Sequence, residues 1–251
     1  MQTLGDLVAA AREREGVLFT APERSAPYSY TDFGTNVWKG GNLLRHYGVR
    51  EGMRVAVVVG PKNPTEGDEP GYLREAPDAV LAFLAAALDG AVVDVDPPGA
   101  VDATALVAPA AWLDRYELGP GTKALAYGGP SDDPTVAQFE RELWSENPLA
   151  PPAELAPDDP VLAADETYTH GALLAASERV AADSDIDEGT TVALRAPITT
   201  AGALVAGVLA PMRAGGTVML GRDSDEVADV AVAVDESVPE ERVIRPADVS
   251  V

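Results

Sequence analysis

The second half of the chain repeats the pattern of the first. A Tyr-Thr pair opens a helical stretch and a Glu-Gly pair follows some twenty residues later, at Tyr30 and Glu51 and again at Tyr168 and Glu188. Further segments correspond in the same order: Arg54–Val59 with Thr191–Ala196, Val80–Asp96 with Leu204–Asp223, Ala105–Pro109 with Val230–Val234, and Lys123–Tyr127 with Arg242–Pro246. The repeat predicts two similar lobes, residues 1–147 and 148–251, the second being a pseudo-repeat of about residues 28–128.

Each repeat alternates apolar strands with helices. Continuous apolar runs at Met53–Val59 and Ala91–Val95 are bounded by glycine, which is typical of buried strands. Apolar spacing and capping residues predict helices over 3–14, from Thr31 or Asp32 to about Tyr47, and over 77–90. Because such strands alternate with helices, we expect an α/β fold in which each lobe is a mostly parallel sheet flanked by helices. The second repeat closes near Val251, so we expect a finished two-lobe unit joined by the Pro-rich, acidic connection around Ser145–Pro160.

The charge balance excludes several function classes. Asp and Glu total 41 against 18 Lys and Arg, a formal charge of −23, so a nucleic acid or an anionic membrane is not an expected partner. No apolar run reaches the roughly 18 residues of a spanning helix, and the N-terminus lacks a signal-peptide pattern. Cysteine is absent, which excludes disulfides, thiolate nucleophiles and Cys-ligated zinc. We expect a cytoplasmic protein.

The same acidity indicates an adaptation to salt. Only three lysines occur, Lys39, Lys62 and Lys123, and much of the apolar content is Ala and Val. At molar salt the Debye length falls to about 3 Å, so the self-repulsion of so many carboxylates is largely screened. The composition resembles that of halophilic archaeal cytosolic proteins; the alternative is an ordinary acidic protein.

Four segments resemble a known family. Residues 28–59 and 77–98 are similar to the opening of AMP-forming acyl-CoA synthetases and their adenylating (ANL) relatives, with the turn before RVAVVV and the helix-strand run VLAFLAAALDGAVVDVD. Residues 158–180 and 194–220 are similar to the middle region of the same family. The resemblance covers nearly all 251 residues and implies the N-terminal subdomains of such a synthetase. These motifs are mostly packing motifs, so they are stronger evidence for the fold than for an activity.

The clearest departure from the family lies at its phosphate-binding loop. Family members carry a loop of the type Y-T-S-G-T-T-G-x-P-K-G, whose backbone N–H groups cradle ATP phosphates. Here Val161–Ala164 leads through Asp165-Glu166-Thr167 directly to Tyr168, and the family's T-H pair corresponds to Thr169 and His170. Two carboxylates therefore stand where the loop would be, and like charge opposes a triphosphate.

Two further departures concern the acyl pocket and the later motifs. Where the family usually carries an aromatic residue and a His after Pro197, this chain has Thr199 and Thr200. The sequence ends at Val251, before the family's adenine, ribose and magnesium-side motifs and its mobile C-terminal domain. Gly221-Arg222-Asp223 is similar to the start of the family's hinge motif G-R-x-D, but it follows a strand, and we interpret the similarity as coincidence.

Other chemistry has little support in the sequence. There is no nucleophile elbow, no dinucleotide fingerprint and no Walker motif. The histidines are His46, late in a predicted helix, and His170, at a helix start. Residues 183–187 have the carboxylate spacing of a calcium loop but lack its turn Gly and closing Glu, and the pair Asp94 and Asp96 is interpreted as a hydrated strand end. We therefore predict no metal site.

Trp38, Trp112 and Trp144 fall in predicted helices and are expected in the core.

Three functional hypotheses follow. The first is a non-catalytic synthetase-like protein without catalytic residues or cofactor, in which Thr169 and His170 are vestigial. It would bind a small apolar or nucleotide-like ligand between the lobes, a full-length synthetase, or a second copy of itself. The second is half of a split ligase that uses ATP or AMP and magnesium with a partner chain. The third is a purely structural, oligomerising scaffold.

Overall fold

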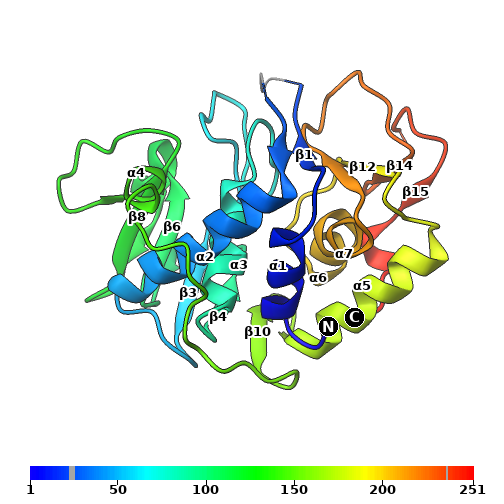
Figure 1. Ribbon diagram of the computed structural model, residues 1–251. Coiled ribbons are helices and arrows are strands. Elements are labelled where there is room, and N and C mark those ends of the chain that lie inside the picture. The colour runs from blue at the N-terminus through cyan, green and yellow to red at the C-terminus, as the bar shows by residue number, and fades with distance from the viewer. Residues whose placement is uncertain (23–25, 236) are drawn as a thin grey trace.

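The computed structural model describes residues 1–22, 26–235 and 237–251 and arranges them around two sheets (Figure 1). The first sheet has seven strands in the order β11-β10-β4-β3-β6-β8-β9, and all neighbours are parallel except β10 and β11. Its strands are β3 (Arg54–Val57), β4 (Val92–Asp94), β6 (Ala105–Pro109), β8 (Lys123–Tyr127), β9 (Ala137–Gln138), β10 (Pro160–Ala163) and β11 (Thr167–Thr169). A separate two-stranded sheet pairs β5 (Ala100–Val101) with β7 (Glu117–Leu118).

The second large sheet has six strands in the order β15-β14-β12-β13-β1-β2, and only β1 and β2 are antiparallel. Its strands are β1 (Val17–Thr20), β2 (Tyr28–Ser29), β12 (Thr191–Leu194), β13 (Thr217–Met219), β14 (Val230–Val232) and β15 (Val243–Ile244). Superposing the two orders matches β11 with β2, β10 with β1, β4 with β13, β3 with β12, β6 with β14 and β8 with β15. The prediction of an α/β fold with two similar, mostly parallel lobes is confirmed.

The two halves of the chain exchange hairpins. The hairpin β1–β2, from the N-terminal half, joins the second sheet through the parallel pairing of Phe19 with Val218. The hairpin β10–β11, from the C-terminal half, joins the first sheet through the pairing of Leu162 with Val93. Each sheet is therefore completed by a hairpin from the other side of the predicted boundary between residues 147 and 148.

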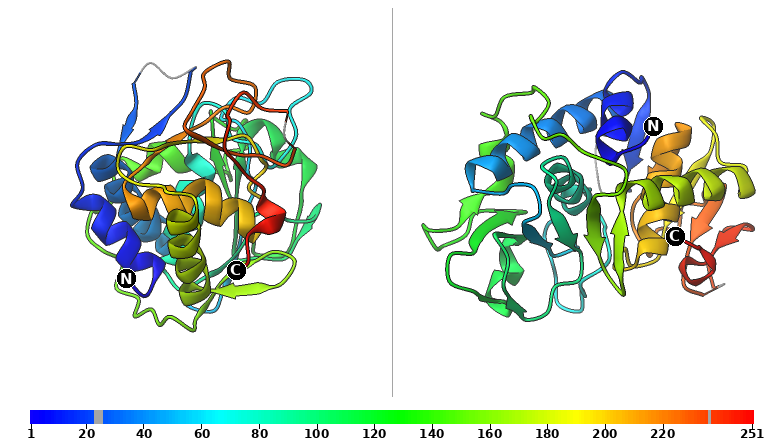
Figure 2. Two further views of the ribbon diagram at one scale, coloured as in Figure 1. Left: turned by 90° about the vertical axis from the view of Figure 1, so that its right-hand side faces the viewer. Right: turned by 90° about the horizontal axis from the view of Figure 1, so that it is seen from below.

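The helices pack mainly in the space between the two sheets (Figures 1 and 2). They are α1 (Leu4–Arg12), α2 (Tyr30–His46), α3 (Asp78–Ala87), α4 (Phe139–Leu143), α5 (His170–Asp183), α6 (Ala201–Leu204) and α7 (Ala210–Ala214), with a π-helical turn η2 (Val205–Leu209) between α6 and α7 and 3₁₀ turns η1 (Ala110–Arg115) and η3 (Pro246–Asp248). The predicted helices over 3–14, 31–47 and 77–90 correspond to α1, α2 and α3. The Thr3 hydroxyl accepts the Asp6 N–H at the start of α1. The predicted cap of α2 at Thr31 or Asp32 is wrong: the Ser29 hydroxyl accepts the Asp32 N–H, so the helix begins one residue after Ser29 and includes both predicted caps.

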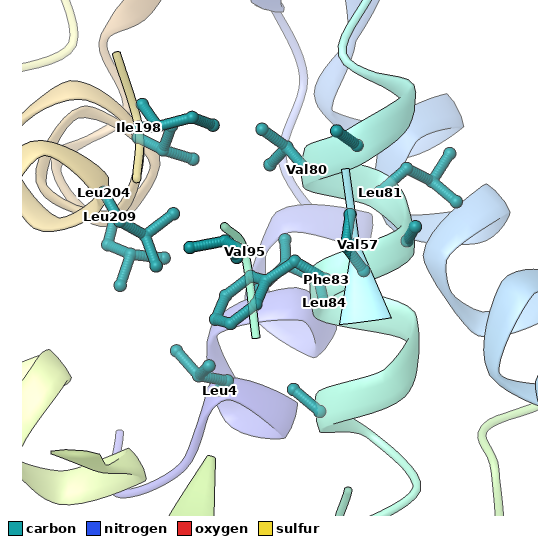
Figure 3. Close-up of a cluster of buried hydrophobic side chains, with 14 of the residues drawn as sticks. Leu4, Val57, Val80, Leu81, Phe83, Leu84, Val95, Ile198, Leu204 and Leu209 are labelled. Carbon is teal, nitrogen blue, oxygen red and sulfur yellow. The ribbon is translucent and has the colours of Figure 1, made fainter. Parts of the chain in front are cut away.

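One apolar core joins the two lobes (Figure 3). Helix α3 is buried all round after Asp78, which suits a helix enclosed by other elements. Its Phe83, 1% exposed, lies among side chains of the second lobe such as Ile198 and Leu204, which are 2% and 1% exposed. The centre of the lobe interface is therefore filled by side chains. Among the described helices, none has both the length and the apolar character that a membrane span requires.

Candidate functional site

The hairpin β10–β11 occupies the position at which the family resemblance places a phosphate loop. Ala163 pairs with Thr167, and only three residues connect the strands. The connection is closed by the Ala164 N–H, which donates to the Glu166 carbonyl at 2.9 Å. The turn is three residues long, against the long glycine-rich loop of the family, and it contains no glycine that would let its backbone approach phosphate oxygens closely.

Carboxylates surround this turn. Asp165 accepts a hydrogen bond from the Tyr168 hydroxyl at 3.1 Å; burial and then this carboxylate raise the pKa of Tyr168 to about 12. Ala163 is paired with Asp94 at the end of β4, and burial together with the Asp94 charge raises the pKa of Asp96. Like charge at the turn and the neighbouring strand end opposes a triphosphate, so these residues do not fit ATP. Across the described residues, no group of three or more His, Asp or Glu is arranged to hold a metal ion.

The two predicted vestigial residues have structural roles here. The Thr169 hydroxyl accepts the Ala172 N–H at 3.2 Å and caps α5. His170 is fully buried, and its Nδ1 accepts the Leu4 N–H at 3.2 Å, so the imidazole ties the start of α5 to the start of α1. Desolvation lowers the pKa of His170 to about 4, because burial disfavours the imidazolium.

This shift predicts an acid-sensitive contribution from His170. Between pH 6.5 and about 4 the unfolded chain binds a proton that the folded chain excludes, so the stability from neutral His170 is present above pH 6.5 and is lost as the pH falls. When the pH falls from 7.5 to 5, we expect the unfolding free energy of the wild type to decrease by about 2 kcal/mol more than that of His170→Gln. Urea titrations in molar KCl measure it. A difference that does not change with pH would contradict a depressed pKa for this imidazole.

The remaining predicted positions are dispersed. Thr200 caps α6 through the Ala203 N–H, and Thr199 lies against Gly71. His46 is an exposed residue at the end of α2 and packs edge-on against Tyr47. Residues 183–187 are the last residue of α5 and the turn after it, where the Asp187 carboxylate accepts from the Gly189 N–H and the Thr190 hydroxyl.

The three tryptophans differ in burial. Trp112 is buried and Trp38 half-buried beneath the Arg12 guanidinium, which lies 3.6 Å from its ring centroid. The expectation of a core position is wrong for Trp144, whose residue surface is 83% exposed. It caps the C-terminus of the five-residue helix α4, whose buried residues Phe139 and Leu143 lie four apart on one face, so the next position, 144, lies off that face.

A pocket of about 570 Å³ opens at the rim of the lobe interface. One wall is the long loop 58–77 between β3 and α3, which contributes Tyr72 and Arg74, and the other is the loop 221–226 after β13, which contributes Arg222. The first wall crosses to the second lobe at Gly71, whose carbonyl accepts the Ile198 N–H at 2.9 Å. Gly71 has φ +105°, and a Cβ there would lie 2.8 Å from Pro197, so this close crossing requires glycine.

A buried ion pair fixes the second wall. Arg195 donates to both carboxylate oxygens of Glu240, at 2.8 and 2.6 Å, and their side chains are 4% and 0% exposed. The remaining guanidinium donors reach the carbonyls of Arg222 and Ser224, at 3.0 Å each, and of Glu226 at 2.8 Å. Burial by itself would raise the pKa of Glu240, but the hydrogen bonds from Arg195 and a backbone N–H outweigh it and lower the pKa.

The pocket was not predicted from the sequence. One difference between the repeats could have indicated the pocket: the loop after β3 has 20 residues (58–77), whereas the loop after its counterpart β12 has six (195–200). The arginine in the otherwise apolar run TVALRA was a second signal, since a buried guanidinium requires nearby acceptors.

The fold is similar to that of solved CoA ligases, although no family model and no curated protein matches the sequence. A benzoate CoA ligase from Burkholderia xenovorans superposes with a TM-score of 0.70 at 18% identity, covering 92% of this chain and 50% of the ligase. An anthranilate CoA ligase in complex with anthranoyl-AMP gives 0.68 at 12% identity, covering 88% and 45%.

The isolated N-terminal domain of FACL13 from Mycobacterium tuberculosis gives a TM-score of 0.63 at 14% identity, covering 90% of this chain and 58% of that domain structure. The chain thus spans about half the length of the solved ligases that it resembles. Together with the repeated α/β lobes, these comparisons show that the chain has the fold of the N-terminal part of AMP-forming acyl-CoA synthetases.

Proposed function

We propose that this chain is a non-catalytic, acyl-CoA synthetase-like module that acts by binding a ligand or a partner protein. One observation carries the proposal: the turn Ala164–Glu166, closed by its own hydrogen bond and carrying two carboxylates, replaces the phosphate loop that the family resemblance places there. Adenylate formation depends on oriented phosphates and charge neutralisation, and this turn provides neither.

The packing of the lobe interface narrows where a ligand can bind. Phe83, Ile198 and Leu204 are at most 2% exposed, so an apolar ligand would have to displace core side chains from the centre. The rim pocket, with about 570 Å³ between two lobes, lies within the size range of small-molecule sites. We therefore place ligand binding at the rim.

Exchange of pyrophosphate into ATP tests the absence of catalysis. We expect no exchange by the purified protein in molar KCl with benzoate, anthranilate or a fatty acid, because the turn cannot hold the triphosphate. A solved benzoate CoA ligase, assayed in its own buffer, is the positive control. Exchange by the protein alone would overturn the proposal, whereas exchange that needs a second chain would identify half of a split ligase using ATP and magnesium.

Thermal shift and light scattering separate binding from a purely structural role. A binding module gains stability from its ligand by mass action, about 2.7 kcal/mol at a hundredfold excess over Kd. A scaffold that only oligomerises would show a stable assembly and no shift with any nucleotide, acid, CoA or organic cation.

A further inference from the structure

The rim pocket has walls that are held in place from within each lobe. In the first wall, Arg74 donates to the Asp68 carboxylate at 2.9 and 3.1 Å and to the Asn63 carbonyl at 2.8 Å. In the second wall, Arg195 donates to three alternate carbonyls of the loop 221–226, those of Arg222, Ser224 and Glu226. A ligand would therefore enter a preformed space and would not have to order either loop, which favours affinity.

The Arg222 side chain indicates that the pocket favours a cation on the Tyr72 ring. The Arg222 guanidinium lies over the Tyr72 ring, 4.5 Å from its centroid, and within the described part of the chain its carboxylate contact is a loose one to Asp223 at 3.9 Å. The Arg222 side chain is 55% exposed, so it can leave the ring without breaking a buried interaction. A cation on an aromatic face is a favourable pairing that a ligand cation can reproduce.

The charges around the ring agree with this. Five carboxylates line the pocket against two guanidinium groups, and one of those, Arg74, is paired with Asp68. Carboxylates cover this whole acidic chain and mark no site by themselves. Here they matter because they surround an aromatic face inside a cavity, where they oppose a phosphate and favour a cation.

We propose that the rim pocket binds an organic cation of the guanidinium or alkylammonium class, seated on the Tyr72 ring in the place now taken by Arg222. This inference deepens the proposed binding function by naming its ligand class, and it departs from the nucleotide-like ligand expected from the sequence. The cation can be a free small molecule or an arginine or lysine side chain of a partner, since both present the same group.

Butylguanidinium and its neutral isostere butylurea test the proposal by isothermal titration in 0.5 and 2 M KCl. We expect saturable binding of butylguanidinium and at least about fivefold weaker binding of butylurea, because only the first carries the charge that the ring attracts. A capped Gly-Arg-Gly peptide, titrated alongside, distinguishes the sources: tighter binding of the peptide indicates a protein partner, and tighter binding of the free cation indicates a small molecule.

Substitutions of Tyr72 and Arg222 should change the affinity for butylguanidinium in opposite directions. Tyr72→Ala should weaken butylguanidinium binding about fivefold or more, Tyr72→Phe should retain it, and Arg222→Ala should tighten it severalfold by removing the internal competitor. Arg115→Ala is the matched control, since Arg115 lies 4.6 Å from the Trp112 ring centroid outside this pocket. Thermal unfolding confirms that each variant is folded.

Two results would overturn the proposal. One is equal binding of butylurea and butylguanidinium, or no saturable binding of either cation source. The other is binding of AMP that Arg222→Ala abolishes, because Arg222 would then be a phosphate ligand. Pyrophosphate exchange by the protein would overturn the non-catalytic function and leave the cation site standing, so the two failures are distinguishable.

Discussion

Replacing Arg195 by Met is expected to lower the free energy of unfolding by about 3 to 5 kcal/mol, since it leaves the Glu240 carboxylate buried without its partner. The variant also loses the hydrogen bonds that Arg195 donates to the carbonyls of Arg222, Ser224 and Glu226, which adds to the loss of stability. Urea unfolding in molar KCl measures the change. The deficit should become smaller at low pH, because protonation removes the buried charge of Glu240.

A surface ion pair provides the control for Arg195. Arg213 lies 2.7 Å from Glu178, whose side chain is 68% exposed, and Arg213→Met should cost less than about 1 kcal/mol. The double variant Arg195→Met with Glu240→Met should recover part of the stability, since the unpaired carboxylate is gone while the three carbonyls stay without the guanidinium. Equal effects of Arg195→Met and Arg213→Met would show that the buried pair does not hold the loop.

The sequence anticipated local structure well and the pairing of distant segments poorly. Pro77 and the alanine-rich run after it predict α3, and the expected helices over 3–14 and 31–47 correspond to α1 and α2, although the cap of α2 is Ser29 and not Thr31 or Asp32. These signals lie within a few residues of one another. The strand Val17–Thr20 was not predicted, because four residues between a helix and a turn have too little periodicity to be recognised.

Neither the hairpin exchange nor the rim pocket could be predicted from local sequence patterns. The repeat predicts two similar, mostly parallel lobes but does not indicate that each hairpin crosses to the other half, because that choice depends on which strand edge is left open in the assembled lobes. The pocket unites Tyr72 and Arg222, which are far apart in the sequence. The replacement of the phosphate loop by Asp165 and Glu166 could be predicted because it involves neighbours in the chain only, whereas the hairpin that these residues close was not predicted.

Raising KCl from 0.1 to 3 M is expected to raise Tm substantially. The formal charge of −23 is spread along the chain, and its self-repulsion in the folded state weakens as the Debye length falls from about 10 Å to about 3 Å or less. Relief of about 5 kcal/mol of repulsion would raise Tm by roughly 10 to 20 °C in a chain of this size. Circular dichroism or calorimetry across the salt series measures the shift, and a flat profile would count against adaptation to salt.

Charge screening and general salt effects on hydration can be separated with two denaturants and two variants. In the Tyr72→Ala variant, which lacks the proposed cation site, low guanidinium chloride screens charge and should raise Tm before it denatures, whereas urea carries no charge and should only lower Tm. The variant combining Glu66→Gln, Asp132→Asn, Glu154→Gln and Asp158→Asn removes four exposed carboxylates and should need less KCl to reach the same Tm. If the variant and the wild type follow the same curve, self-repulsion is not what the salt relieves, and the acidic surface must act through its hydration instead.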